Sequence, residues 1–110
     1  MTLRTVDLFA GCGGLSLGFQ KEEYKIVAAF ELWDAAVKCY KENFSHSVYQ
    51  TDLSNVDEAV KIIRELKPDI IIGGPPCQDF SHAGKRIEAD RASLTDSYAK
   101  IICAIKPRAF

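Results

Sequence analysis

The sequence predicts an α/β protein in which helices flank a parallel sheet. Short β-branched runs alternate along the chain with apolar stripes of helical spacing, and glycine-containing turns follow two of these runs. The composition agrees, because 47% hydrophobic and 26% charged residues in a chain of 110 suit one soluble globular domain. Strands that alternate with helices of this size pair in parallel through right-handed crossovers.

Four strands are expected, together with the beginning of a fifth. Each is a short run rich in β-branched or aromatic residues that stops at a glycine, a proline or a polar residue. The strands are expected at residues 5–9, 25–30, 48–50 and 69–72, and the fifth begins at 108–110.

The first two helices follow the first two strands. One begins after the turn at residues 10–14 and carries Leu15, Gly18 and Phe19 on one face. The other is expected to be capped by Asp34, because an aspartate side chain can accept hydrogen bonds from the first free amides of a helix.

Two more helices are expected in the second half. The third has the pattern of a capping box at residues 54–57 and an apolar stripe that ends before Pro68. A long polar loop is expected from Gln78 to about Ser93. The stripe of the fourth helix then follows, with Leu94, Tyr98, Ile101, Ile102 and Ile105.

The composition restricts the class of protein without selecting a partner. With 14 basic and 15 acidic residues the net charge is −1, which neither indicates nor excludes nucleic acid. The sequence lacks both an apolar run near the ~20 residues of a membrane span and the pattern of a signal peptide. We therefore expect a cytoplasmic protein. Because the chain stops where the next core strand would enter the sheet, we expect the amino-terminal portion of a larger catalytic domain.

The four cysteines differ in their settings. The separations of Cys12, Cys39, Cys77 and Cys103 are 27, 38 and 26 residues, which predict neither a zinc site nor a disulfide framework. Cys39 and Cys103 fall in helical patterns, where a cysteine is usually a small buried hydrophobe. Cys77 instead follows glycines and prolines after the apolar run 69–72. It is expected at the carboxyl end of a strand, where open α/β sheets place their chemistry.

The turn at residues 10–14 has the composition of a ligand-binding loop. Gly11, Gly13 and Gly14 permit positive φ and close backbone approach, and the helix start offers unpaired amides to a polar ligand. Glu31 lies 20 residues beyond Gly11 at a strand end, where an acid can accept hydrogen bonds from both hydroxyls of a ribose. Asp52, at the end of the third strand, is placed to bind an adenine amino group. The three strand ends together predict an adenosine site.

Two other interpretations use the same residues. A dinucleotide-binding oxidoreductase has this architecture, but its glycine fingerprint requires glycine at the position of Ser16. Alternatively, the glycines form only a tight strand-to-helix turn, Glu31 is a solvated residue, and Asp52 is a turn residue.

Two motifs resemble the signatures of one family, the DNA cytosine-5 methyltransferases. The family's first signature is similar to Asp7-Leu8-Phe9-Ala10-Gly11-Cys12-Gly13-Gly14 with Gly18-Phe19, and its catalytic signature to Gly74-Pro75-Pro76-Cys77-Gln78 with Phe80-Ser81. Their order and their separation of about 65 residues match as well. The resemblance runs from Thr5 to Phe110 and covers the first part of the family's catalytic domain. It implies a Rossmann-like, class I S-adenosylmethionine-dependent methyltransferase fold, incomplete in this chain.

The resemblance implies roles for individual residues, and it implies no metal. Phe9 is expected against the adenine, Glu31 on the ribose, and Cys77 as the nucleophile. Residues 91–94 resemble a further signature in which Ala92 replaces a glycine. The residues implied to bind S-adenosylmethionine are Phe9, Ala10, Gly11, Gly13, Gly14, Leu15, Glu31, Leu32, Asp52, Leu53, Pro75 and Leu94. Those implied to bind the target are Pro76, Gln78, Ser81 and Arg91.

The implied activity is transfer of a methyl group from S-adenosylmethionine to carbon 5 of cytosine in DNA. The Cys77 thiolate adds to carbon 6, which makes carbon 5 nucleophilic, and the cysteine leaves after carbon 5 loses its proton. The target base must leave the duplex, and residues 78–92 are a candidate clamp around it. Within that loop, Lys85, Arg86 and Arg91 either meet DNA phosphates or are simply solvated.

The implied partners are DNA and a complementary carboxyl-terminal methyltransferase chain, and we expect the chain alone to be inactive. Two alternatives remain open at this point. One is an RNA cytosine-5 methyltransferase, which uses the same thiolate chemistry. The other is an inactive remnant that binds the cofactor or assembles with a partner.

Overall fold

The structure, a computed structural model, describes residues 2–76 and 88–110, and the side chains of all of these except 88–93. Within these ranges strands and helices alternate, as the sequence predicts. The elements in chain order are β1 (Arg4–Leu8), α1 (Gly14–Lys21), β2 (Lys25–Glu31), α2 (Asp34–Asn43), β3 (Ser47–Gln50), α3 (Val56–Leu66), β4 (Ile70–Gly73) and α4 (Glu88–Ile105).

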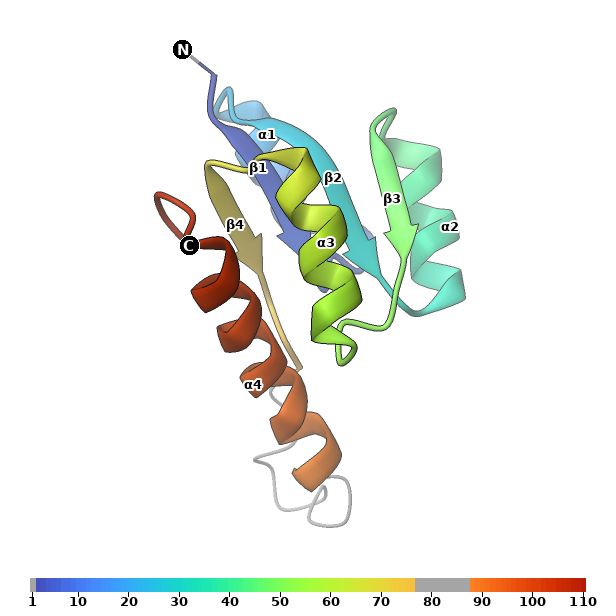
Figure 1. Ribbon diagram of the computed structural model, residues 1–110. Helices are drawn as coiled ribbons and strands as arrows, with labels where there is room; N and C mark the ends of the chain where they lie inside the picture. The colour runs from blue at the N-terminus through green and yellow to red at the C-terminus, as the bar shows by residue number, and fades with distance from the viewer. Residues whose placement is uncertain (1, 77–87) are drawn as a thin grey trace.

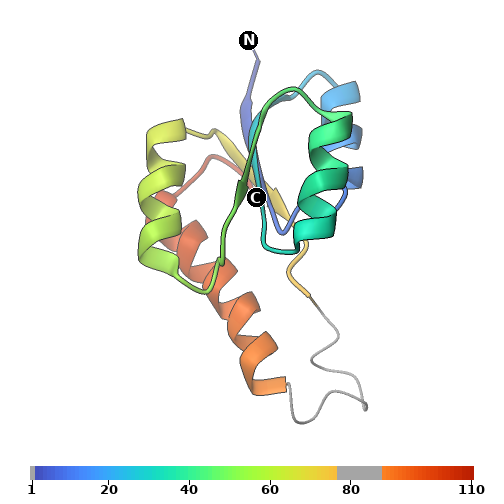
Figure 2. The ribbon, with the colours of Figure 1, turned by 90° about the vertical axis from the view of Figure 1, so that its right-hand side faces the viewer.

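The four described strands form one parallel sheet with the order β3-β2-β1-β4. Helices α1 and α2 cover one face, and α3 and α4 cover the other (Figures 1 and 2). The chain therefore leaves β1 toward one face and β4 toward the opposite face. The carboxyl ends of these two neighbouring strands form the switch point at which open α/β sheets bind ligands.

The register of β2 against β1 shifts once. Thr5 pairs with Ile26, whereas Val6 pairs with Ala28, so one residue of β2 is extra at this point. Such a bulge changes the side of the sheet to which the following residues point. Ala28 consequently packs in the same apolar cluster as Val6, whereas Ile26 packs in a different cluster.

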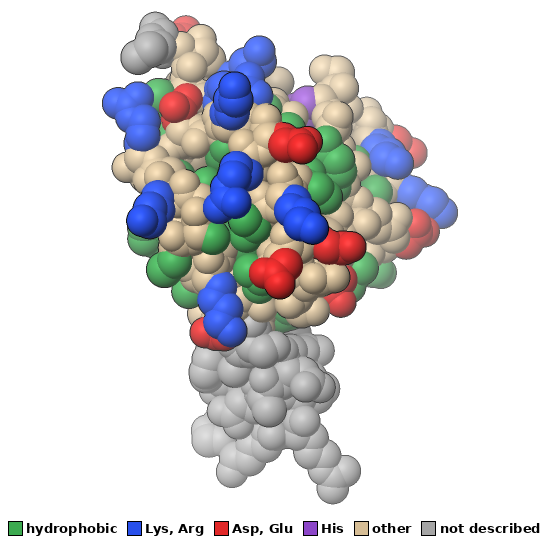
Figure 3. All heavy atoms as spheres, in the orientation of Figure 1, with side chains coloured by type: hydrophobic (Ala, Val, Ile, Leu, Met, Phe, Trp, Pro, Cys, Tyr) green, Lys and Arg blue, Asp and Glu red, His purple; other side chains and the backbone are tan. Residues whose placement is uncertain are grey.

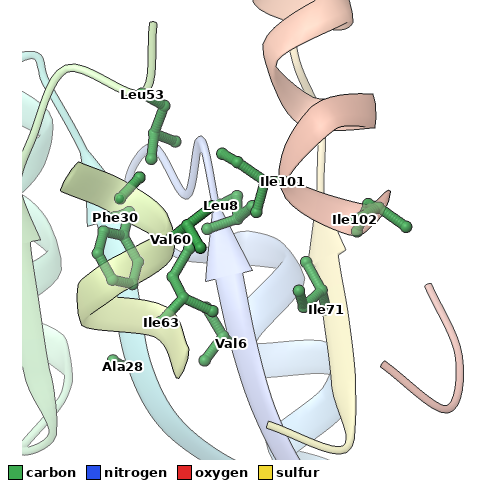
Figure 4. Packing of buried hydrophobic residues seen from close by; sticks show 11 residues of the cluster. Val6, Leu8, Ala28, Phe30, Leu53, Val60, Ile63, Ile71, Ile101 and Ile102 are labelled. Atoms are coloured by element: carbon green, nitrogen blue, oxygen red, sulfur yellow. The ribbon is translucent and has the colours of Figure 1, made fainter. Parts of the chain in front are cut away.

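The larger apolar core lies between the sheet and helices α3 and α4. Leu8 from β1, Phe30 from β2 and Ile71 from β4 meet Ile63 from α3 and Ile101 from α4, and all five side chains have no measurable exposure (Figure 4). Burial of side chains of this size contributes about 1.5–3 kcal/mol each, and this core holds the strand ends in place.

The outer surface of this layer is charged. Ala59, Val60 and Ile63 of α3 face inward, while Lys61 and Glu65 of the same helix are exposed. Figure 3 shows Lys and Arg side chains among Asp and Glu over the face formed by α3 and α4. This mixture matches the nearly neutral charge of the sequence and marks an ordinary solvated surface.

Two predicted helix caps are wrong. Trp33, not Asp34, is the N-cap residue of α2, and Asp34 lies in the first turn, where its carboxylate pairs with Lys38 at 3.1 Å. The N-cap residue of α3 is Asn55, not Ser54, whose hydroxyl and amide both donate to Asp52. No side chain caps α3, so the predicted capping box does not form.

The boundaries of the last elements also differ from expectation. Helix α4 begins at Glu88, so residues 88–93 are helical although their sequence has no apolar stripe and a loop was expected there. The rest of the expected loop, residues 78–87, lies outside the described residues. The fifth strand is represented by a single parallel bridge between Ile70 and Ala109, with the amide of Ile71 donating to the Ala109 carbonyl at 3.2 Å. Among the described residues, no helix is long and apolar enough to cross a membrane.

Candidate functional site

A cavity of about 1100 Å³ opens at the carboxyl edge of the sheet. Residues that end or follow each described strand line it, and α4 adds one side chain. It combines apolar walls with three acidic side chains, and apolar walls with a few polar groups are typical of a small-molecule site. The lining residues are Phe9, Glu31, Leu32, Trp33, Asp34, Gln50, Thr51, Asp52, Leu53, Gly74, Pro75, Pro76 and Leu94.

Glu31 connects the loops that follow β1 and β2. Its Oε1 accepts a hydrogen bond from the Gly11 amide at 3.0 Å, and its Oε2 accepts one from the Trp33 amide at 2.7 Å. Each carboxylate oxygen has two lone-pair sites, so these bonds leave acceptor capacity on both oxygens. The side chain is thus oriented by the backbone before any ligand binds.

The glycine loop requires its glycines at two points. Gly11 and Gly13 have φ angles of 59° and 101°, in the left-handed region that side chains rarely adopt. A Cβ on Gly13 would also lie 2.9 Å from the ring of Tyr40. Gly13 is the N-cap residue of α1, and the loop rests on α2 through this contact.

A chain of buried hydrogen bonds joins the strand before this loop to the helix after it. The Ser16 hydroxyl on α1 donates to Oδ2 of Asp7 on β1 at 2.6 Å, and the Tyr40 hydroxyl on α2 donates to Ser16 at 2.9 Å. His46 Nε2 contacts the Tyr40 oxygen at the outer end. Because each hydroxyl has one proton, His46 must donate from Nε2 for the bonds to run toward Asp7. The bond between Asp7 and Ser16 closes the segment that contains the glycine loop.

Burial shifts the pKa values of the titratable side chains in this hydrogen-bonded chain. Asp7 is 1% exposed and its Oδ1 has no hydrogen-bond partner among the described residues. Burial raises the pKa of Asp7 to about 6, against the opposing effect of the Ser16 bond. Burial likewise raises the pKa of Tyr40 to about 12 and lowers the pKa of His46. The sequence did not predict these hydrogen bonds between distant side chains, although Asp7, a charged residue inside the apolar strand β1, indicated that a buried polar partner was needed.

Asp52 follows β3 and lines the cavity. Its Oδ1 accepts hydrogen bonds from the Ser54 amide at 2.9 Å and the Ser54 hydroxyl at 2.6 Å. These bonds, that from the hydroxyl first, lower the pKa of Asp52, so this carboxyl group is charged at neutral pH. Asp52 thus stabilises the turn before α3, and this does not decide between a turn role and a ligand role. Oδ2 takes part in neither bond and remains compatible with a ligand role.

The apolar walls are built partly from the core. Leu53 is 3% exposed and belongs to the large core cluster, against which Phe9 also packs. Phe9 has a φ of 57° and its ring lies 6.4 Å from that of Tyr98 on α4. Leu32 and Trp33, by contrast, are 55% and 69% exposed at the rim. The lining residues Trp33, Asp34, Gln50 and Thr51 were not predicted as site residues, although they lie close in sequence to residues that were.

Not every predicted cofactor residue lines this cavity. Of the twelve, the lining includes Phe9, Glu31, Leu32, Asp52, Leu53, Pro75 and Leu94. Ala10 is buried against Ala29 and Tyr40, while Gly11 reaches the site through its bond to Glu31. Gly14 and Leu15 line a separate shallow groove on α1 with Phe19 and Tyr24.

The predicted target-binding residues are described less completely. Pro76 lines the cavity. Cys77, Gln78, Ser81, Lys85 and Arg86 lie outside the described residues, as do the side chains of Arg91 and Ala92.

The structure also corrects the interpretation of two cysteines. Cys103 is exposed and Cys39 is only partly buried, so neither is the fully buried hydrophobe that the helical patterns predict. Within the described part of the chain, no group of three or more His, Cys, Asp or Glu side chains could hold a metal ion.

Comparison with known proteins agrees with the motifs. The family model for C-5 cytosine-specific DNA methylases matches residues 3–110. The type II methyltransferase M.HindV of Haemophilus influenzae is 57% identical over 98% of this chain, and M.HgiGI of Herpetosiphon aurantiacus is 53% identical over 96%. The chain spans 36% of the length of M.HindV and 84% of that of M.HgiGI.

Solved structures confirm the predicted fold class. A crystal structure described as a DNA modification methyltransferase encoded within an E. coli prophage has a TM-score of 0.81 and 30% identity, covering 96% of this chain and 30% of its own. The Dnmt2 methyltransferase of S. pombe has a TM-score of 0.73 at 20% identity, covering 96% of this chain and 31% of its own. At that identity the second likeness concerns the fold alone.

Proposed function

We propose that this chain, which belongs to the C-5 cytosine-specific DNA methylase family, supplies the S-adenosylmethionine site and the nucleophile of a DNA cytosine-5 methyltransferase. The observation that carries the proposal is the cavity at the carboxyl edge of the sheet. Glu31 and Asp52 border it, and so does Pro76, the residue before Cys77. DNA is the proposed substrate. A carboxyl-terminal methyltransferase segment, on the same chain or on another, is the proposed partner.

The residues around the cavity suit an adenosine. The Glu31 carboxylate is already oriented by two backbone amides and retains acceptor capacity for both ribose hydroxyls. Phe9, Leu53 and Leu94 offer apolar contact to an adenine ring, and the charged Asp52 is suited to accept a hydrogen bond from its amino group. When bound here, S-adenosylmethionine supplies the methyl group that is transferred to cytosine.

Cys77 performs the covalent step of the proposed reaction. Its thiolate forms a bond to carbon 6 of cytosine, and the ring electrons that this releases make carbon 5 the nucleophile. After carbon 5 gains the methyl group, a base removes its proton, the ring double bond re-forms and the carbon–sulfur bond breaks. Cys77 leaves as the thiolate that began the cycle.

A binding measurement tests the cofactor site. We expect Glu31→Gln to weaken S-adenosylhomocysteine binding by about 10-fold to 100-fold in calorimetric titration, because charge-assisted hydrogen bonds contribute about 1.5–3 kcal/mol. Glu65→Gln, at an exposed position on α3, is the matched control. Thermal unfolding of both variants separates lost binding from lost folding. Equal affinity of the folded Glu31→Gln and Glu65→Gln variants would reject the role of Glu31.

A transfer measurement tests the nucleophile. The chain is joined to the carboxyl-terminal two thirds of the Haemophilus influenzae relative and supplied with S-adenosylmethionine labelled in the methyl group. Label is expected in cytosine-containing DNA, and Cys77→Ser should abolish it, whereas Cys103→Ser, a change at an exposed position on α4, should not. Transfer that survives Cys77→Ser would reject the mechanism. Transfer to RNA of the same sequence, and not to DNA, would favour the RNA methyltransferase alternative.

A trapped complex provides a second test of the covalent step. DNA that contains 5-fluorocytosine should remain bound to the joined protein after denaturation, because fluorine cannot leave carbon 5 as a proton does. The Cys77→Ser variant should form no such complex. Activity with the normal base but no complex with the fluorinated base would contradict covalent attack by Cys77.

A further inference from the structure

Phe9 has a backbone conformation that is unusual for its place in the chain. In the described part of the chain, the residues other than glycine with a positive φ are Phe9, Glu23, Lys67 and Lys106. The last three lie at the carboxyl ends of helices, where a left-handed residue is common because it ends the helix. Phe9, with a φ of 57°, instead follows strand β1. For a bulky aromatic residue this conformation is strained, so the surroundings of Phe9 must hold it.

The ring of Tyr98 on α4 is one of the groups against Phe9. The two ring centroids are 6.4 Å apart and the ring planes are tilted by 40°, which lies within the range of favourable aromatic pairs. Both side chains also pack against the large apolar core. Phe9 lines the cavity, whereas Tyr98 is not among the lining residues. Tyr98 therefore supports the wall of the cavity without forming its surface.

The same tyrosine ring touches the end of β4. A Cβ on Gly73 would lie 2.8 Å from Cε2 of Tyr98, so the edge of the ring lies directly against the backbone at this residue. Gly73 is the last residue of β4, and residues 74–76 line the cavity before Cys77. Tyr98 thus contacts the chain after β1, just before the glycine loop, and at the end of β4, just before the proposed nucleophile.

We propose that Tyr98 is a positioning residue for methyl transfer, whose ring fixes Phe9 beside the cofactor and Gly73 before the nucleophile segment. This inference rests on the proposed function, because the ligand beside Phe9 is the proposed S-adenosylmethionine. The ring performs this role rather than the hydroxyl, because the hydroxyl makes no hydrogen bond among the described residues. Both reactants are then held from one side chain, and a shift of that side chain displaces both.

The first arm of the test measures the affinity for S-adenosylhomocysteine by calorimetry. Tyr98→Ala should weaken binding about tenfold, the loss expected when an aromatic contact to a base is misplaced. Tyr98→Phe keeps the ring and should bind as the wild type does. Tyr98→Leu keeps an apolar side chain against the core but lacks the ring. It should bind as weakly as Tyr98→Ala, and it replaces that variant in the test if Tyr98→Ala does not fold.

Ile105→Ala is the matched control for a purely structural role. Ile105 lies on the same helix about two turns from Tyr98, and it too is partly buried against the large apolar core. Its replacement should lower the free energy of unfolding, measured by urea denaturation, without changing the affinity. Wild-type affinity of the folded Tyr98→Ala and Tyr98→Leu variants would overturn the proposal. An equal loss of affinity in Ile105→Ala would overturn it as well.

The second arm measures methyl transfer by the chain joined to the carboxyl-terminal part of its Haemophilus influenzae relative. Tyr98→Ala should raise KM for S-adenosylmethionine and also lower kcat about tenfold, because a displaced Gly73 misplaces the nucleophile. Tyr98→Phe should restore both constants. A raised KM with an unchanged kcat would reject the role of Tyr98 at Gly73.

The two arms separate this inference from the proposed function. If the wild-type chain does not bind S-adenosylhomocysteine, the proposed cofactor site fails and this inference fails with it. If the wild-type chain binds and the Tyr98 variants bind equally well, the cofactor site stands and only the inference is rejected.

Discussion

The two faces of the sheet bury different chemistry although they share the same strands. In β1, Val6 and Leu8 face α3 and α4 in a purely apolar core, whereas Asp7 faces α1 and α2 and begins a polar chain through Ser16 and Tyr40. The apolar core on the α3 and α4 face holds the strands together. The polar side chains on the α1 and α2 face fix the glycine loop, because their hydrogen bonds connect the strand before that loop to the helix after it.

The difference shows how stability and precision are divided in this fold. Apolar contacts are individually weak and tolerate small shifts, but in sum they supply most of the free energy of folding. A buried hydrogen-bonded chain adds less net free energy, yet it permits only one arrangement of its donors and acceptors. The polar layer lies beside the glycine loop, where the proposed cofactor site needs a precisely positioned backbone.

The largest effect is expected from the apolar face. We predict that Ile63→Ala destabilises the chain by about 2–5 kcal/mol, because Ile63 has no measurable exposure and its removal leaves a cavity between α3 and the sheet. Urea denaturation followed by circular dichroism measures the free energy of unfolding.

The neighbouring residue provides the control for that prediction. Ile62 is next to Ile63 on α3 but is only partly buried against the core. Ile62→Ala should therefore destabilise the chain by less than Ile63→Ala. Equal losses of stability would indicate that α3 packs differently from the description above. The apolar face would then not be the layer that supplies most of the stability.

The next effect concerns Asp7 and depends on pH. Its pKa is raised from 3.8 to about 6 in the folded state. Between these two pH values, the folded protein therefore holds a proton on Asp7 that the unfolded protein has lost. The Asp7 contribution to stability is therefore present at the acidic end and declines as the pH rises. At about 1.4 kcal/mol per pKa unit, the decline amounts to about 3 kcal/mol.

Asp7→Asn isolates this contribution, because it removes the titrating group and keeps an acceptor for Ser16. The stability of the wild type, measured relative to Asp7→Asn by urea denaturation across the window, should fall with rising pH. A relative stability that rises with pH would mean that Asp7 is stabilised as a carboxylate. The polar face would then be an ion pair or a hydrated site rather than a desolvated one.

Much of this fold was predictable because its signals are local. Runs such as residues 69–72 specify a strand from their own side chains, and the glycines at 11 and 13 specify the left-handed turns that the structure contains. The two strand-end acids were likewise visible, because the rule that sites lie at the carboxyl edge of a parallel sheet converts sequence position into spatial position.

The features that were missed depend on contacts between distant residues. Tyr40 fits an apolar helical stripe, and nothing in that pattern indicates that its hydroxyl reaches Ser16 on another helix. The start of α4 at Glu88 was missed because helix boundaries without an apolar stripe leave little local signal.

The smallest effect tests the outer part of the polar face. We predict that Tyr40→Phe destabilises the chain by about 1–2 kcal/mol, because Ser16 loses a buried donor and His46 loses its partner while the ring contacts remain. Tyr49→Phe is the matched control, since Tyr49 stacks on Phe30 with ring centroids 4.9 Å apart and its hydroxyl makes no hydrogen bond among the described residues. Denaturation measures both losses. If Tyr40→Phe destabilises the chain no more than Tyr49→Phe, the Tyr40 hydroxyl contributes no more to stability than a solvated hydroxyl does. The glycine loop must then be held in place by the ring of Tyr40, which lies against Gly13.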